Sequence, residues 1–387
     1  MVRARDLGIR IGRMAPGPND AITDVAGVRV GHRTLIRGDG PLVVGKGPVR
    51  TGVTVIVPHD GDVWREPLFA GWHRLNGNGE LTGLQWIAEA GLLGGVVGLT
   101  NTHSVGAVHE ALVRAAASHG PTDDFWALPV VGETYDGLLN DINGFHVRPA
   151  DAEAALDDAL RAPAHEPIGE GNVGGGTGMV CHGFKGGIGT ASRAVGAESG
   201  GWMVGVLVQA NYGRRDLLRI DGVPVGLFIT DEEVPNPWLQ ALGLERRGEP
   251  AAGDAGSIII VVATDAPLLP HQCDRLAQRA SLGLARMGSI AGHSSGDLIL
   301  VFATANRGMS VAPGRRDPRL THDVRAVTDR AIDPLFEATA EAAEAAIVNA
   351  LLAAETMTGR DGVTAHAVPH DRLVEILAVH GRPVAAR

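Results

Sequence analysis

Residues 245–264 read ERRGEPAAGDAGSIIIVVAT, and the character of the chain changes abruptly inside this stretch. Its first part, Glu245–Gly256, is charged or small and has no apolar periodicity, which predicts a linker. Its second part, Ser257–Thr264, is almost entirely β-branched, the pattern of a strand buried on both faces of its sheet. We therefore expect a linker to end at Gly256 and a central strand to begin at Ser257.

On either side of this junction, the chain alternates short β-rich runs with helical patterns. The absence of an internal repeat together with this alternation favours an α/β or layered α+β architecture. Asp333 is expected to cap the last helix and Gly359 to follow its end. The glycine-rich segment Pro167–Gly189 is predicted to be a loop. The expected strands are Thr51–Val57, Gly95–Thr100, Trp126–Val131, Trp202–Ala210 and Asp297–Thr304, and the expected helices are Leu81–Ala90, Val105–Ser118, Pro270–Arg286 and Asp333–Thr358.

Composition narrows the classes of function. With 44% hydrophobic and 20% charged residues, the 387-residue chain can bury a large core, and its net charge of −10 offers no basic stripe for nucleic acid. The two cysteines, Cys181 and Cys273, are expected to be free buried thiols. Because no apolar run is long enough to span a membrane or serve as a signal peptide, we expect a cytoplasmic protein without a membrane partner. The 15 histidines lack metal-ligand spacing, so neither a metal nor another cofactor is expected.

Two short motifs match known fingerprints but lack the context that these fingerprints need. Residues 169–174 (GEGNVG) fit the dinucleotide pattern, yet no strand precedes them and no helix follows. Residues 292–296 (GHSSG) fit the nucleophile elbow, but here the helix comes before the serine and the strand after it. We therefore interpret the first as a structural loop and reject the second as an elbow.

Ser257 is the residue whose position suggests chemistry. A serine hydroxyl can attack the carbonyl carbon of the preceding residue, and Gly256 tolerates the strained backbone that this attack requires. Cleavage would leave Ser257 with a free α-amine of pKa about 8, against roughly 10.4 for a lysine, so the amine can serve as a base near neutral pH. On these residues alone, a serine that merely starts a strand is the favoured interpretation.

Five ordered blocks resemble the L-aminopeptidase/D-amidase-esterase family, the S58 serine peptidases that include the β-peptidyl aminopeptidases. The resemblance runs along nearly the whole chain, which makes it more specific than any single motif. The blocks are Asn19–Val25 (NDAITDV), Val131–Gly137 (VGETYDG), Val208–Gly213 (VQANYG), Gly256–Ile260 (GSIII) and Ala353–Gly362 (AAETMTGRDG).

The resemblance implies a role for each matching residue. Ser257 matches the nucleophile that is freed by cleavage after Gly256. Ser295 and Asp297 match the hydroxyl and carboxylate that orient the new N-terminal serine, where Asp297 could hold its protonated amine. Asn211 matches the side-chain amide that donates in the oxyanion hole.

On the substrate side, Glu133 and Tyr135 match binding residues, since an aminopeptidase must recognise a free ammonium group. A surface carboxylate and a packed ring remain the alternative interpretations of these two. Asn349 and Glu355 could also approach the site, but structural hydrogen bonding is the simpler interpretation of both.

The implied fold is a four-layer αββα sandwich that resembles N-terminal-nucleophile hydrolases in its layers but differs in connectivity. It forms one domain from fragments 1–256 and 257–387, and we expect a homo-oligomer of such processed pairs. The implied reaction is acyl transfer from a peptide, amide or ester substrate to Ser257. The alternatives are an ω-amino-acid oligoamide hydrolase or an acyltransferase of related fold, both of which favour threonine at this position, and an uncleaved binding protein without activity.

Overall fold

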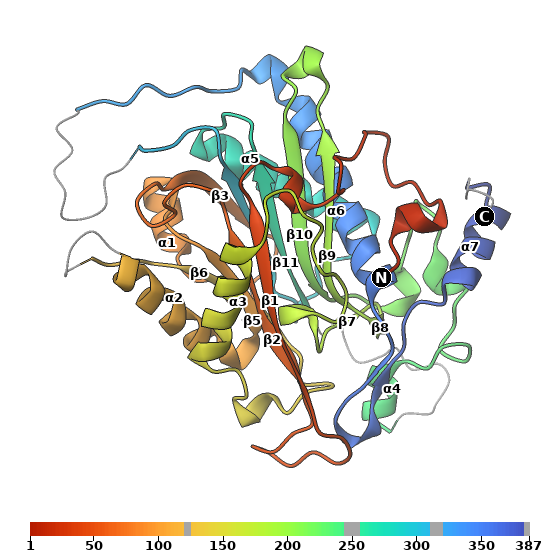
Figure 1. The fold of residues 1–387 in the computed structure, drawn as a ribbon. Coiled ribbons are helices and arrows are strands. Elements are labelled where there is room, and N and C mark those ends of the chain that lie inside the picture. The colour runs from red at the N-terminus through yellow and green to blue at the C-terminus, as the bar shows by residue number, and fades with distance from the viewer. Residues whose placement is uncertain (120–124, 244–255, 310–319, 383–387) are drawn as a thin grey trace.

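A computed structural model describes residues 1–119, 125–243, 256–309 and 320–382. In this part of the chain, two stacked sheets form the centre of the molecule, with helices on both outer sides (Figure 1). The linker predicted at 245–256 lies outside the described residues, apart from Gly256 itself.

The strands form two large sheets and two small pairs. The first sheet has the order β1 (Arg29–Arg37), β2 (Val49–Val57), β5 (Val97–Asn101), β6 (Val130–Thr134). The second has the order β4 (Leu92–Leu93), β3 (Leu68–Arg74), β12 (Asp297–Ala303), β11 (Ser257–Thr264), β10 (Met203–Asn211), β9 (Gly187–Ala194). The small pairs are β7 (Val180–Cys181) with β8 (Phe184–Lys185), and β13 (Met357–Thr358) with β14 (Thr364–Ala365).

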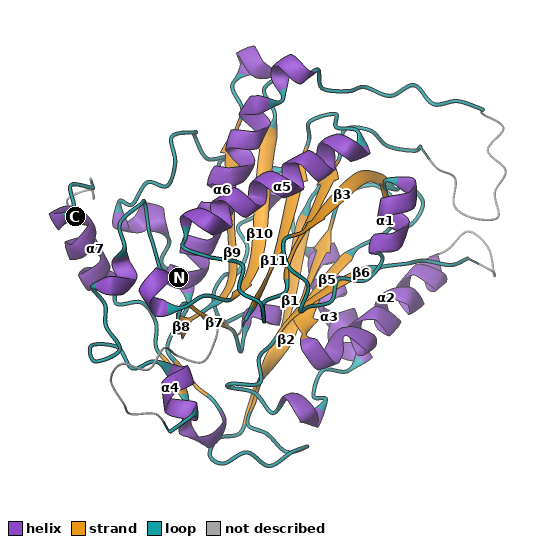
Figure 2. Ribbon diagram, turned by 180° about the vertical axis from the view of Figure 1, so that it is seen from behind, coloured by secondary structure: helices purple, strands orange, loops and turns teal. Residues whose placement is uncertain are grey.

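Helices cover the outer face of each sheet. The first sheet packs on α2 (Val105–His119) and α3 (Pro149–Arg161), and the second on α5 (Pro270–Arg286) and α6 (Asp333–Ala353), which Figure 2 shows from behind. The remaining helices are α1 (Leu84–Ala90), α4 (Pro237–Ala241) and α7 (His370–Val379). The predicted αββα sandwich is therefore confirmed.

The alternation of side chains along β11 explains why this strand is central. Ile258, Ile260 and Val262 join the core shared with α5 and α6, whereas Ile259 and Val261 join the core between the two sheets. Every residue of the strand is buried, as the β-branched run predicts.

The alanine-rich helix α6 packs closely on both of its neighbours. On α5, a Cβ at Gly283 would lie 2.5 Å from the carbonyl oxygen of Ala340, so the two helices meet where side chains are smallest. On β9, a Cβ at Gly189 would lie 2.0 Å from the carbonyl oxygen of Ala346. The helix therefore packs tightly on both α5 and β9.

The structure corrects the predicted end of that helix. It ends at Ala353 rather than Thr358, because Ala354 is extended and the backbone of Glu355 exchanges two hydrogen bonds with the Asn172 side chain. Asp333 is the first helical residue, with Ile332 in the cap position, and Gly359 follows β13 instead of the helix.

Two other predicted boundaries were wrong. The strand expected at Trp126–Val131 begins only at Val130, after Pro129, which has no N–H for a sheet. The glycine-rich segment expected to be a loop contains β7, β8 and the start of β9. In this segment, strands form by backbone pairing although the pattern of side chains does not predict them.

Candidate active site

Ser257 is the first residue of β11 and lies directly opposite Asn211, the last residue of β10. Partners in an antiparallel pair have Cα atoms about 4.5–5.5 Å apart, so the two side chains are neighbours. Along their strands both share the parity of the residues that face the other sheet, Ile259 and Leu207. The Oγ of Ser257 accepts a hydrogen bond of 3.1 Å from the backbone N–H of Gly296.

The position before the serine accepts only glycine. A Cβ at residue 256 would lie 2.0 Å from the carbonyl oxygen of Asn211 and 2.8 Å from the Cα of Tyr212. Gly256 therefore lets the chain pass close to the end of β10 and deliver Ser257 next to Asn211. This packing gives a second reason, besides backbone strain, for the Gly–Ser junction.

Asn211 has one half of its amide satisfied and the other half free. Its Oδ1 accepts a hydrogen bond of 2.8 Å from the backbone N–H of Val180, while its Nδ2 is buried without a partner among the described residues. A buried donor without an acceptor costs about 1–3 kcal/mol, so such groups are rare unless a ligand or water completes them. The Nδ2 group is thus a ready donor beside Ser257.

Ser295 and Asp297 form a buried hydroxyl–carboxylate pair on the neighbouring strand. The Ser295 hydroxyl donates to Oδ1 of Asp297 at 2.5 Å, and the backbone of Gly296 between them is the group that contacts Ser257. Because β11 and β12 are parallel, with Ile258 opposite Asp297, this pair lies at the same sheet end as Ser257.

Asn76 is a site residue that the sequence analysis missed. Its Nδ2 donates to Oδ2 of Asp297 at 3.0 Å, and its Oδ1 accepts from the backbone N–H of Asp297. It belongs to the turn 76–79 (NGNG) after β3, and the only available signal was a polar turn whose position in space the sequence does not reveal. Asn76 thus binds both the carboxylate and the backbone N–H of Asp297.

Glu133, near the end of β6, is brought to the same edge. Its Oε2 accepts from the Thr102 hydroxyl and its Oε1 from the backbone N–H of Glu80 at 3.1 Å. A Cβ at Gly79 would lie 3.1 Å from the Cα of Gly296 and 3.3 Å from Oε1 of Glu133. Gly79 therefore lies between the carboxylate of Glu133 and Gly296, whose N–H binds Ser257. Burial raises the pKa of Glu133 more than these hydrogen bonds lower it.

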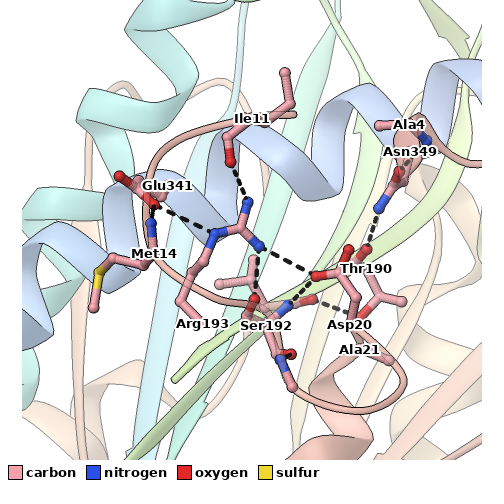
Figure 3. A network of polar contacts seen from close by, with 12 residues as sticks. Ala4, Ile11, Met14, Asp20, Ala21, Thr190, Ser192, Arg193, Glu341 and Asn349 are labelled. Carbon is pink, nitrogen blue, oxygen red and sulfur yellow. Dashed lines mark hydrogen bonds and ion pairs between the residues drawn. The ribbon is translucent and has the colours of Figure 1, made fainter. Parts of the chain in front are cut away.

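The other sequence-predicted residues lie differently. Tyr135 is 41% exposed, and its hydroxyl lies over Gly137, where a Cβ would come within 2.4 Å of it. Asn349 bonds the backbone of Ala4 and Thr190 in a separate polar network (Figure 3). Glu355 is exposed and uses its backbone, as described above. Asn349 and Glu355 are thus in structural hydrogen bonds.

The two rejected motifs lack the context of their fingerprints in the structure as well. Asp297 begins a strand two residues after Ser295, so the GHSSG turn is no nucleophile elbow, and residues 169–174 lead into a 3₁₀ turn rather than a helix.

Across the described ranges, no group of three His, Cys, Asp or Glu side chains could hold a metal ion. None of the helices there is long and apolar enough to cross a membrane. Cys181 and Cys273 are both buried and form no disulfide.

Comparison with known proteins identifies what this chain resembles. The model of peptidase family S58 matches residues 20–365. The β-peptidyl aminopeptidase BapA of Sphingosinicella microcystinivorans is 47% identical over 385 residues, which cover 100% of this chain and 94% of the relative.

Two solved structures share the fold of this chain along nearly its whole length. A β-aminopeptidase of a Burkholderia species is 50% identical with a TM-score of 0.88, covering 99% of this chain and 100% of that one. The L-aminopeptidase D-Ala-esterase/amidase of Ochrobactrum anthropi is 45% identical with a TM-score of 0.86, covering 99% of each chain. That protein is described as a prototype for the serine aminopeptidases and a new variant of the Ntn hydrolase fold. The resemblance stated from the sequence is confirmed.

Proposed function

The chain belongs to peptidase family S58 and is a peptide hydrolase with aminopeptidase and amidase-esterase character, and from this premise we propose that Ser257 is its nucleophile after cleavage of the Gly256–Ser257 bond. The observation that carries the proposal is the buried, unpartnered Nδ2 of Asn211 directly across the strand pair from Ser257. A hydroxyl beside a free buried donor is the arrangement that acyl transfer requires.

In the proposed reaction, Ser257 Oγ attacks the carbonyl carbon of the substrate while its proton passes to the Ser257 α-amine. The resulting oxyanion is held by Asn211 Nδ2 and by the backbone N–H of Gly296, which already points at the Ser257 side chain. The protonated amine then gives its proton to the leaving amine, and water releases the acyl group through the reverse steps.

The base exists only after cleavage, because in the continuous chain the Ser257 nitrogen is a peptide amide. We assign the orientation of the new ammonium to Ser295 and Asp297. The carboxylate of Asp297 is held by Ser295 and Asn76, so it can accept from the ammonium without moving. A pre-positioned carboxylate favours the catalytic geometry because less side-chain entropy is lost in each turnover.

Glu133 is the proposed anchor for the free ammonium group of the substrate. It is a buried carboxylate whose four acceptor sites are only partly used by Thr102 and Glu80. Tyr135 is the proposed outer contact, since its exposed ring follows the same strand end by two residues. An anchor for the substrate ammonium at the same sheet edge as the nucleophile would select the amino-terminal residue for removal.

The experiment that tests self-cleavage is denaturing electrophoresis of the purified protein. We expect two fragments, 1–256 and 257–387, with the amino-terminal sequence Ser-Ile-Ile-Ile-Val on the smaller one. Ser257→Ala should remain a single inactive chain of 40.2 kDa. Ser281→Ala, a change in the middle of α5, is the matched control and should be cleaved normally. A single band for the unmodified protein, or cleavage of Ser257→Ala, would refute the mechanism.

The names of the relatives favour β-amino acids as the released residues. We therefore propose that β-alanyl p-nitroanilide is cleaved with a higher kcat/KM than its L-α-alanyl counterpart, measured on the same preparation. The opposite order would favour the α-aminopeptidase alternative without changing the mechanism. A cytoplasmic homo-oligomer of processed pairs stays a prediction, which light scattering of the purified enzyme checks for its oligomeric part.

A further inference from the structure

Lysine is used at only two positions in this sequence, Lys46 and Lys185, while the other basic side chains are arginines and histidines. Lys46 is exposed, whereas Lys185 in β8 is completely buried. A buried lysine loses its hydration, which costs several kcal/mol unless other groups replace the water. Because lysine is so rare in this sequence and Lys185 is nevertheless buried, we infer that the ammonium of Lys185 has a specific role.

The ammonium of Lys185 sits in a cage of backbone carbonyls. Its Nζ donates to the carbonyl oxygens of Gly176 at 3.3 Å, Met179 at 2.8 Å and Gly186 at 2.8 Å. These three carbonyl oxygens match the three N–H donors of one ammonium nitrogen. A planar guanidinium, whose donors are spread over three nitrogens, could not bind all three oxygens from one nitrogen. Among the described residues no carboxylate forms an ion pair with it, and burial lowers the pKa of Lys185 to about 7.

One of the three carbonyls leads directly to the active site. The carbonyl of Met179 and the N–H of Val180 belong to the same planar peptide unit, so fixing one fixes the other. The N–H of Val180 is the group that donates to Oδ1 of Asn211. A donor on Oδ1 decides which way the amide faces and leaves Nδ2 on the side away from Val180.

We propose that Lys185 is a positioning residue for the oxyanion hole, acting through the Met179–Val180 peptide on the side-chain amide of Asn211. The inference rests on the proposed function, because it requires Asn211 Nδ2 to contact the oxyanion. The ammonium holds the peptide in place and polarises it, and the peptide in turn polarises the Asn211 amide. Hydrogen bonds linked in this way strengthen one another in a low-dielectric interior.

The structure also shows what holds the cage together from outside. The backbone N–H of Lys185 donates to the carbonyl of His366 at 2.7 Å, and the N–H of Gly186 donates to the carbonyl of Met179 at 2.9 Å. The cage is therefore tied to the carboxy-terminal fragment as well as to its own turn. Its geometry is expected to survive loss of the ammonium well enough for the protein to fold.

The test is a double-mutant cycle between Lys185 and Asn211, with rates normalised to the amount of cleaved enzyme. Lys185→Met keeps most of the side-chain volume but donates no hydrogen bond. We expect it to lower kcat by about tenfold or more with KM nearly unchanged, since the interaction acts on the transition state. In an Asn211→Ala background the same change should cost less than about twofold, because the group through which Lys185 acts is gone. Lys46→Met is the matched control and should leave kcat and KM unchanged.

Each other outcome contradicts the proposal. An equal loss of kcat in both backgrounds would show that Lys185 acts independently of Asn211. A raised KM with normal kcat would place it in substrate binding instead. If Lys185→Met does not fold, Lys185→Gln, which keeps a neutral donor, replaces it in the cycle, and failure of both to fold would assign Lys185 to stability alone. Ser257→Ala separates this result from the proposed function, because its loss of activity does not depend on Lys185.

Discussion

Arg193 and Ser257 are the centres of two buried polar clusters that use their hydrogen-bonding groups differently. Around Arg193, the guanidinium contacts the carboxylates of Asp20 at 3.2 Å and Glu341 at 3.4 Å and donates to the carbonyl of Ile11 at 2.7 Å (Figure 3). Around Ser257, the Nδ2 of Asn211 has no partner in the described part of the chain. The Nε of Arg193 makes no hydrogen bond either, but it forms an ion pair with Glu341, so we call this cluster closed. The Nδ2 of Asn211 has neither kind of partner among the described residues.

In the proposed mechanism, this difference separates a structural cluster from a reactive one. In the Arg193 cluster, the amino-terminal segment is tied to β9 and α6, so its polar groups stabilise the fold only in this one arrangement. In the Ser257 cluster, the Nδ2 of Asn211 lacks an acceptor in the resting protein, which destabilises the fold. A developing oxyanion would supply that acceptor, so the hydrogen bond would stabilise the transition state. Mutations in the first cluster should therefore change unfolding, and mutations in the second should change catalysis.

The largest expected effect on stability comes from Arg193→Met. It leaves the carboxylates of Asp20 and Glu341 buried without their cation, which typically costs about 3–5 kcal/mol. We expect the free energy of unfolding in urea to fall by this order, while kcat of the folded enzyme stays normal. Arg13→Met is the control, because Arg13 pairs with Glu337 on the surface, where water screens the charges, and should change unfolding far less. Equal losses in both variants would show that the buried ion pairs of Arg193 add no more to stability than a surface pair, and a lowered kcat in Arg193→Met would remove the distinction between the clusters.

Asn211→Ala tests the other cluster and should lower kcat by about 10²–10³-fold, roughly 2.7–4 kcal/mol, with little change in KM. Asn349→Ala is its counterpart in the closed cluster, where the side chain bonds Ala4 and Thr190 with both ends. We expect Asn349→Ala to lower the melting temperature without lowering kcat. A lowered kcat in Asn349→Ala together with a normal kcat in Asn211→Ala would contradict the distinction between the two clusters.

Asp297→Asn should change the pH dependence of kcat/KM. If Asp297 holds the ammonium of Ser257, its negative charge favours the protonated amine and raises that pKa. Removing the charge should move the acid limb of the profile to lower pH, while the maximum rate falls because the amine is held less firmly. The measurement needs an ester without an amine of its own, such as p-nitrophenyl acetate. An unmoved acid limb would exclude Asp297 as the partner of the amine.

The last prediction concerns a carboxylate that belongs to neither cluster. Asp136 is fully buried, and its carboxylate accepts from the neutral side-chain amides of Asn101 and Asn140. Burial raises its pKa to about 7, because the hydrogen bonds to the carboxylate offset only part of the lost hydration. An acid whose pKa is raised on folding stabilises the folded state below its unfolded pKa, and this contribution is lost as pH rises through the folded value.

We therefore expect stability to fall between about pH 4 and pH 7 by at most about 1.4 kcal/mol per pH unit from this group. Urea unfolding of Asp136→Asn, measured over the same range, should lack this contribution. A slope that is identical in the unmodified protein and in Asp136→Asn would show that the carboxyl of Asp136 does not titrate there.

Much of the fold could be predicted because its elements have strong local patterns. The β-branched run of β11 and the amphipathic repeat of α5 predicted their bounds correctly, whereas β6 and the end of α6 were misjudged. The start of β6 follows a local feature, Pro129, which has no N–H for the sheet, whereas the end of α6 depends on a partner far along the chain. For α6 the partner is Asn172, whose side chain competes for the backbone of Glu355.

The sequence by itself determined the layered fold, the central strand that begins at Ser257, and the family to which the chain belongs. These follow from patterns within short stretches and from the order of five motifs, which need no knowledge of contacts in space. Only the tertiary structure decided that Asn76 supports Asp297, that Asn211 keeps a free donor and that Lys185 stands behind it. The physical reason is that these relations join residues from different strands and turns, and a hydrogen bond across such distances in sequence has no signature in the residues that make it.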